Sequence, residues 1–219
     1  MTEPLHVDVW SDIACPWCYI GKRKFEAGLA AFDGADDVTV TYHSFELSPD
    51  TPQDYDGSVV DFLSAHKGMP RDQVEQMLSQ VTTIAADVGL DYDFAAVRQT
   101  RTLLAHEALH AARAQGRQLD LVERLFAAYF EEGRHVGSVD ELVALGTEAG
   151  LDGQALRDDL DAGTYSDAVA QDIAQARAYG IQGVPFYVIG GKYGVSGAQR
   201  PEVFTQALEQ VRNEAVGAR

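Results

Sequence analysis

The chain has few cysteines, few basic residues and no long hydrophobic run. Only 2 of its 219 residues are cysteine, so it shows no set of structural disulfides and gives no sign of an oxidising compartment. Its 17 basic residues face 34 acidic ones, for a formal net charge of −17. This balance argues against nucleic acid and anionic membranes as partners, because both attract clustered Lys and Arg. Without an apolar stretch of about 18 residues, no transmembrane helix is expected.

The N-terminal residues Met1-Thr2-Glu3-Pro4 also lack the marks of a leader sequence. They contain no basic region, no long apolar segment and no small-residue cleavage site, and a strand pattern follows at once. We therefore expect a cytoplasmic protein. The acidic residues are spread along the chain, which is typical of a well-solvated surface.

The first 50 residues show a β-α-β pattern. Alternation of apolar and polar residues predicts strands over 5–10 and 38–43. Between them, the spacing of Phe25, Leu29 and Phe32 predicts a helix from about Pro16 to Phe32. A crossover of this length allows parallel strands with a right-handed connection.

The middle of the chain is predicted to be helical, and the C-terminal part returns to strands. Glycines punctuate the middle segment, where we expect helices over 58–67, 70–88, 102–115, 119–132, 138–149, 154–161 and 166–179. Residues 184–189 and 192–196 then form a predicted hairpin around Gly190-Gly191, and a last helix opens at Gln199-Arg200-Pro201.

This order predicts an α/β protein with a thioredoxin-like fold, in which a large all-helical insertion separates the β-α-β half from the β-β-α half. Residues 1–50 and 181–219 would form the thioredoxin-like domain. Residues 51–180 would form the inserted helical subdomain. Because the two halves share one sheet, folding should need both ends of the chain.

The two cysteines stand in one motif, Cys15-Pro16-Trp17-Cys18. Cys15 lies at a predicted helix N-terminus, where unpaired N–H groups and the helix dipole favour a thiolate. We expect Cys15 to attack a disulfide and Cys18, one turn further on, to resolve the mixed disulfide. Pro16 tolerates the first turn and shapes the gap between the sulfurs. Trp17 would cover the site or contact a substrate.

Two other interpretations of the cysteine pair stay open. The pair could be half of a zinc site, or two small buried residues without chemistry. Zinc usually takes four ligands, and the sequence offers no second Cys pair and no nearby His pair, so we expect no metal site. The spacing therefore favours redox chemistry.

Other titratable residues carry weaker signals. A buried acid beneath a CxxC motif could pass protons to the resolving thiol, but for Asp8 and Asp12 we expect surface or capping roles. His106 and His110 share a helix face, yet two ligands are weak evidence for a metal, so we expect core or solvated histidines. The run Lys22-Arg23-Lys24 could raise the local potential, but it is more typical of a solvated helix face.

Gly183-Val184-Pro185 begins the third predicted strand, where proline removes a hydrogen-bond donor from the ladder. In thioredoxin-like proteins a cis-proline faces the CxxC motif and leaves the preceding backbone free to pair with an extended peptide. Val184 and Pro185 match that position. We therefore expect these two residues to bind substrate.

Together these motifs resemble the DsbA family of thiol-disulfide oxidoreductases, most closely its cytoplasmic FrnE-like branch. The resemblance spans nearly the whole chain and rests on Val9-Trp10-Ser11-Asp12, the CxxC motif, Phe45-Glu46-Leu47-Ser48-Pro49, Gly183-Val184-Pro185-Phe186 and Val195-Ser196-Gly197-Ala198-Gln199. It implies an enzyme that acts on protein or small-molecule thiols and disulfides. It implies no cofactor beyond the redox-active Cys15–Cys18 disulfide, with glutathione as a candidate co-substrate.

Two alternative functions remain. Kappa-class glutathione transferases and 2-hydroxychromene-2-carboxylate isomerases share this architecture, but they usually carry serine at the nucleophile position, so the presence of both Cys15 and Cys18 favours disulfide exchange. A non-enzymatic module could instead hold extended polypeptides through the backbone at Val184. The direction of electron flow, the substrate and the oligomeric state do not follow from the sequence.

Overall fold

The structure is a computed structural model that describes residues 4–217. The expectation about a leader sequence used Met1 to Glu3, and these residues lie outside the described part of the chain. The elements in chain order are β1 (Leu5–Ser11), α1 (Pro16–Ala30), a short 3-10 turn (Ala35–Asp37), β2 (Val38–Ser44), α2 (Val59–Lys67), α3 (Arg71–Ala86), α4 (Leu103–Ala114), α5 (Gln118–Phe130), α6 (Val139–Glu148), α7 (Gly153–Ala162), α8 (Ser166–Ala178), β3 (Phe186–Ile189), β4 (Tyr193–Ser196) and α9 (Pro201–Gly217).

The four strands form one mixed sheet in the order β2-β1-β3-β4. Strand β1 pairs in parallel with β2 and antiparallel with β3, and its residue Val7 lies opposite both Val40 and Ile189. Strands β3 and β4 form the hairpin, whose turn glycines, Gly190 and Gly191, both have positive φ. The β-α-β and β-β-α halves therefore share one sheet, and the predicted thioredoxin-like fold with a helical insertion is confirmed.

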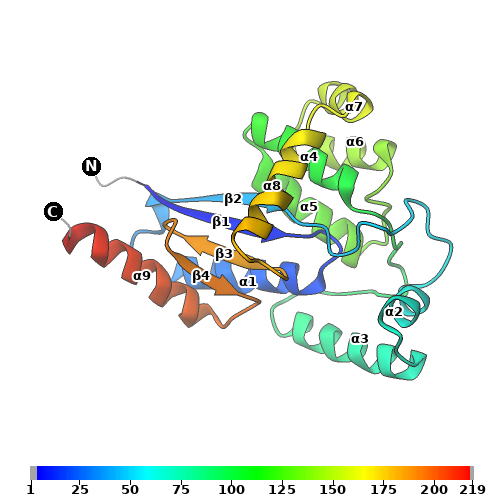
Figure 1. Cartoon of the computed structure of the whole chain (residues 1–219), viewed down its shortest axis with the longest axis horizontal. Coiled ribbons are helices and arrows are strands. Elements are labelled where there is room, and N and C mark those ends of the chain that lie inside the picture. The colour runs from blue at the N-terminus through cyan, green and yellow to red at the C-terminus, as the bar shows by residue number, and fades with distance from the viewer. Residues whose placement is uncertain (1–3, 218–219) are drawn as a thin grey trace.

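Alternation along β1 sends its side chains to two faces. Val7 and Val9 enter the main hydrophobic core, whereas Trp10 packs with Ala176 and Ile181 in a smaller cluster beneath α8. On the first face α9 runs along α1 (Figure 1). There the ring of Phe25 lies against those of Tyr187 and Phe204 and so joins three elements.

The inserted helices form two groups. Helices α4 to α8 pack together beside β2. Helices α2 and α3 form a hairpin near the N-terminal end of α1 (Figure 1). The main core nevertheless runs without a break from the sheet into the helices, with Val9, Leu121 and Leu145 in one cluster. The division into a thioredoxin-like domain and an inserted subdomain stays a prediction. None of the helices described is long and apolar enough to cross a membrane.

Two local predictions need correction. Strand β3 begins at Phe186 rather than Val184, because Pro185 has no N–H to give to a ladder. The spacing of Ser138 and Glu141 predicts a capping box at the start of α6, but the Ser138 side chain makes no cap bond. Instead, the Glu141 carboxylate accepts a hydrogen bond of 2.7 Å from Arg134.

Candidate active site

Cys15 is the residue that immediately precedes α1. Its backbone is extended, with φ −92° and ψ 110°, and no side chain caps the helix. Pro16 occupies the first helical turn, and Cys15 N donates to Asp12 O at 3.1 Å, which closes the turn after β1. Cys18 lies one turn into the helix, and its N–H donates to Cys15 O at 3.0 Å. The sequence thus places Cys15 among the unpaired N–H groups of a helix start.

The loop before β3 lies directly against Cys15. The Val184–Pro185 peptide bond is cis, and the Cys15 thiol Sγ lies 3.6 Å from Val184 O. Close packing holds the loop there, because a Cβ on Gly21 of α1 would come within 2.8 Å of both the Pro185 ring and the Tyr187 hydroxyl. Glycine is therefore needed at position 21. The predicted partners Cys15 and Val184 meet although they lie 169 positions apart in the sequence.

The two cysteines are free thiols, and both are buried. Burial raises the pKa of Cys18 well above its ordinary value, and the hydrogen bond and charge of Cys15 raise it further, whereas the Ser11 side chain and the Asp12 backbone oppose this only in part. Cys18 is therefore a protonated thiol at neutral pH. A protonated thiol is a weak nucleophile, so Cys18 reacts only after a base removes its proton or a mixed disulfide forms beside it.

A buried acid, Asp12, lies beneath the cysteine loop. Its carboxylate accepts hydrogen bonds from Leu47 N at 2.7 Å and Ala14 N at 3.3 Å, and it lies 3.5 Å from His106 Nε2. Burial alone would raise the pKa of Asp12, but His106 and the Leu47 N–H outweigh it and lower that pKa. The expected surface role of Asp12 is wrong, although it does cap the turn through Ala14. His106 is a core histidine, which is one of the two roles, core or solvated, that were expected for it from the sequence.

Tyr92 also contacts the motif and was not predicted. Its hydroxyl donates to Pro16 O at 2.7 Å, and its ring stacks on those of Tyr19 and Phe130. Tyr92 lies between α3 and α4, 76 residues from Pro16. No local pattern marks such a residue, because the contact depends on how the inserted helices pack.

In the basic run after the motif, Lys22 is not solvated as expected, whereas Arg23 and Lys24 are partly exposed. Lys22 is buried, and its Nζ donates to Glu26 and to Glu123 of α5, each at 2.5 Å. Arg23 pairs with the same Glu123. Burial would raise the pKa of Glu123, but hydrogen bonds from Arg23 and Lys22 lower it to about 2. These cations tie α1 to α5, so their charge is balanced there.

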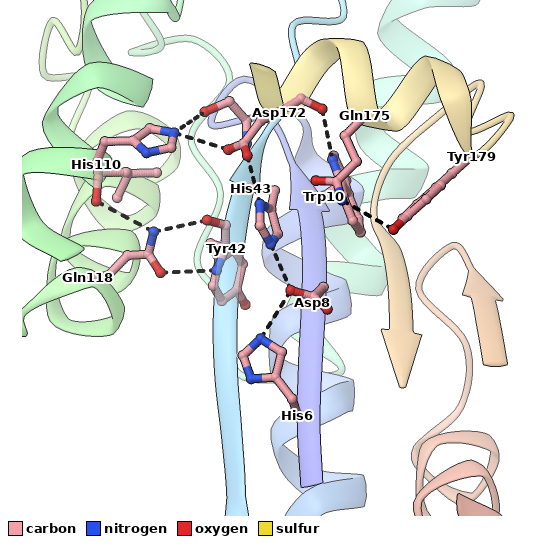
Figure 2. Close-up of polar contacts among 12 residues, drawn as sticks. His6, Asp8, Trp10, Tyr42, His43, His110, Gln118, Asp172, Gln175 and Tyr179 are labelled. Atoms are coloured by element: carbon pink, nitrogen blue, oxygen red, sulfur yellow. Dashed lines mark hydrogen bonds and ion pairs between the residues drawn. The ribbon is translucent and has the colours of Figure 1, made fainter. Parts of the chain in front are cut away.

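A second polar cluster lies between β1, β2, α4 and α8 (Figure 2). Asp172 of α8 is its centre, with Oδ1 2.8 Å from His43 Nδ1 and Oδ2 3.0 Å from His110 Nε2. His43 Nε2 in turn lies 2.8 Å from Asp8 Oδ1. Trp10 stacks on His43 at 4.6 Å and donates from its indole N–H to Asp172 O.

The histidines at 106 and 110 therefore serve different clusters. His106 faces Asp12 at the cysteine loop, whereas His110 faces Asp172. Nowhere in residues 4–217 do three or more His, Cys, Asp or Glu side chains gather in a way that could hold a metal ion. The cluster around Asp172 joins the sheet to the inserted helices by hydrogen bonds and charge.

A four-stranded sheet with a CxxC motif at a helix start and a proline loop against the first cysteine defines a thiol-disulfide oxidoreductase of the thioredoxin-like class. The model of the DSBA-like thioredoxin domain family matches residues 6–209, and the chain belongs to that family. The expected membership of the DsbA family is confirmed.

Known relatives agree with this membership. The chain is 40% identical to a probable DsbA oxidoreductase from Streptomyces coelicolor, whose crystal structure superposes with a TM-score of 0.89 over 96% of this chain and 91% of that one. It is 30% identical to the uncharacterized protein YwbO of Bacillus subtilis over 93% of this chain and 96% of that protein. The cytosolic disulfide reductase DsbM of Pseudomonas aeruginosa shares the fold, with 19% identity, a TM-score of 0.64, and coverage of 95% and 99%.

Proposed function

We propose that the protein catalyses thiol-disulfide exchange, with Cys15 as the nucleophile and Cys18 as the resolving thiol. The observation that carries the proposal is the 3.6 Å contact between Cys15 Sγ and Val184 O, which sets the first cysteine against the cis-proline loop. The position of Cys15 at the start of α1 supports its role, because the helix N-terminus stabilises a thiolate. The raised pKa of Cys18 suits a thiol that reacts second.

In the reducing direction, the Cys15 thiolate attacks one sulfur of the substrate disulfide. A bond forms between Cys15 and that sulfur, and the other substrate sulfur leaves as a thiolate and takes up a proton. Cys18 then loses its proton and attacks Cys15 Sγ. This step releases the second substrate thiol and leaves the Cys15–Cys18 disulfide, so the substrate gains the two electrons that the enzyme loses. The reverse sequence oxidises a dithiol.

The neighbouring residues shape these steps in the proposal. Pro16 fixes the first turn between the two sulfurs. Trp17, which is 39% exposed, offers an apolar surface at the edge of the site. Val184 accepts and donates backbone hydrogen bonds with an extended substrate, and Pro185 holds that backbone in place. No cofactor other than the cysteine pair is required, and glutathione as a co-substrate stays a prediction.

Membership of the FrnE-like branch and a cytoplasmic location are part of the proposal. DsbM is by its name a cytosolic disulfide reductase with the same fold, and it also has a solved structure with glutathione. Its identity to this chain is too low to decide the substrate. The glutathione-dependent transferase or isomerase activity expected as the alternative would need glutathione to bind at millimolar concentration.

The test compares two single variants in the thiol-dependent reduction of insulin. We expect Cys15→Ser to abolish the activity, because the attacking sulfur is gone. Cys18→Ser should keep the attack and accumulate a mixed disulfide at Cys15, which mass spectrometry of the intact protein detects. Wild-type activity in the Cys15 variant would refute the mechanism.

A further inference from the structure

We infer that the cavity beside Cys15 binds a neutral, apolar substituent of the sulfur substrate, so that small lipophilic disulfides and thiols are the preferred class. The inference rests on the proposed exchange chemistry and names the substrate group for the same site. The cavity measures about 270 Å³, and its wall includes Cys15, Pro16 and Trp17. A group bound there therefore lies next to the attacking sulfur.

Much of the rest of the wall is apolar. It comes mainly from the hairpin of α2 and α3 and from α5, with Val59, Phe62, Leu63, Met77, Val81 and Phe130. The hairpin stands beside the start of α1 in Figure 1. At the mouth, Trp17 and Leu47 are two of the four large hydrophobic side chains described as exposed. The apolar surface thus continues from the mouth into the cavity.

Two buried hydroxyl groups in the wall already have protein partners. The Thr100 hydroxyl donates to Gln53 O at 2.6 Å, and the Tyr129 hydroxyl donates to Gln99 Oε1 at 3.2 Å. These hydroxyl donors are unavailable to a ligand unless a protein hydrogen bond breaks. A polar occupant would not regain the hydrogen bonds that it made with water from these two hydroxyl groups, which costs affinity.

The charges in the wall do not favour an anion. The carboxylate of Asp12 lines the cavity, and the basic side chains there, Lys67 and His66, are both exposed at the end of α2. The whole chain carries a formal charge of −17, which repels anions at longer range. Glutathione carries two carboxylates against one ammonium group, so its net negative charge would meet this repulsion, whereas a neutral alkyl or aryl group would not.

Size and access set the scale of the occupant. An apolar cavity of about 150 Å³ in another protein holds benzene, so a cavity of about 270 Å³ has room for a larger alkyl or aryl group. Cys15 is only 3% exposed, and it lines this cavity. A small molecule can therefore approach Cys15 from the cavity with the surrounding elements in place.

The experiment measures how fast reduced enzyme is oxidised by a series of symmetrical dialkyl disulfides, from diethyl to dihexyl. Each rate constant is divided by that of dithiothreitol with the same disulfide, which removes intrinsic reactivity. We expect the ratio to rise about three- to fourfold for each methylene, the factor that corresponds to about 0.8 kcal/mol. The rise should level off once the cavity is full. Glutathione disulfide should give a lower ratio than dibutyl disulfide.

A matched pair of variants tests the location. Met77→Trp fills the cavity and should flatten the dependence on chain length, whereas Gln76→Trp, exposed one position earlier on α3, should leave the series unchanged. With the wild-type protein, 1-hexanol should competitively inhibit oxidation by dihexyl disulfide. It should leave the rate of oxidation by bis(2-hydroxyethyl) disulfide unchanged. The alcohol measurement does not depend on how the Met77 variant folds.

The outcomes separate this inference from the proposed function. If exchange occurs but the ratio of the enzyme rate constant to that of dithiothreitol does not depend on the length of the alkyl chain, the apolar site is refuted. The proposed exchange chemistry is then unaffected. A higher ratio for glutathione disulfide than for dibutyl disulfide also overturns it. Absence of exchange with every disulfide tested refutes the proposed function, and the inference falls with it.

Discussion

Replacing Asp172 by asparagine should destabilise the protein, and more so at acidic than at alkaline pH. Asp172 Oδ1 contacts His43. Its Oδ2 contacts both Ser44 N and His110. An asparagine can keep its oxygen on the side of Ser44 and His110. Its NH₂ group would then face His43 Nδ1 and donate to the neutral ring, so the variant removes the charge while a hydrogen bond remains.

The pH dependence follows from two pKa shifts. Burial alone would lower the pKa of His43, but the hydrogen bonds and charges of Asp172 and Asp8 raise it above the ordinary 6.5. This stabilisation is full below about pH 6.5 and is lost as the pH rises through the pKa of His43 in the folded protein. Burial would raise the pKa of Asp172, yet the hydrogen bonds from His110, His43 and Ser44 N lower it. That contribution is present above about pH 4 and is lost at lower pH.

The decrease in the free energy of unfolding of the variant should therefore be largest between about pH 4 and 6.5. A hydrogen bond to a charged group contributes about 1.5 to 3 kcal/mol, so we expect Asp172→Asn to lower the free energy of unfolding by about 2 kcal/mol at pH 5.5. At pH 9, further above the ordinary pKa of histidine, less of the His43 charge that Asp172 stabilises remains, so the loss should be smaller than at pH 5.5. His110, Asp8 and His6 face the same cluster and are present in both proteins.

Urea unfolding at pH 5.5, 7 and 9 measures the difference, with tryptophan fluorescence as the signal because Trp10 stacks on His43. Asp167→Asn is the matched control. It removes the same charge from α8 at an exposed position, so any loss through the helix dipole should be the same at all three pH values. A loss in Asp172→Asn that is constant, or that grows toward pH 9, would refute the reasoning.

Three further outcomes are expected. In Cys15→Ser, burial keeps the pKa of Cys18 high, so iodoacetamide at pH 8 should alkylate Cys18 far more slowly than free cysteine; equal rates would contradict this. Glu123→Gln should cost about 2 kcal/mol in urea unfolding because buried Lys22 loses a charged partner, and a cost near zero would contradict the pairing. Gly28→Ala should cost about 1 to 3 kcal/mol, because its Cβ would meet a backbone oxygen of α9 at 2.5 Å, and an unchanged melting temperature would show that the helices can separate freely.

Local patterns in the sequence predicted much of the fold. Alternation around Val7 and Val9 gave the first strand, because a strand with one face in a core must repeat every second residue. The cysteine motif and Val184-Pro185 could be found for a similar reason. Their chemistry depends on residue type and on the start of an element, and both are visible locally.

The residues that the sequence did not reveal depend on distant partners. Lys22 resembles a surface lysine with Glu26 four positions on, and only Glu123, 101 residues away, explains its burial. Asp172 lies in a polar helix, and its role depends on Ser44, 128 residues earlier. Side chains of this kind gain their meaning from packing between elements. A single sequence does not specify that packing.

The contact between Cys15 and Val184 also has a consequence for synthesis of the chain. The ribosome adds about 5 to 20 residues per second, so synthesis from Cys15 to Val184, which is 169 positions later, takes between about 8 and 34 s. Throughout that time Cys15 lacks the loop that covers it in the folded protein. The nascent chain therefore presents its thiols to its surroundings before the site exists, and oxidants met in that interval act on an unfolded dithiol.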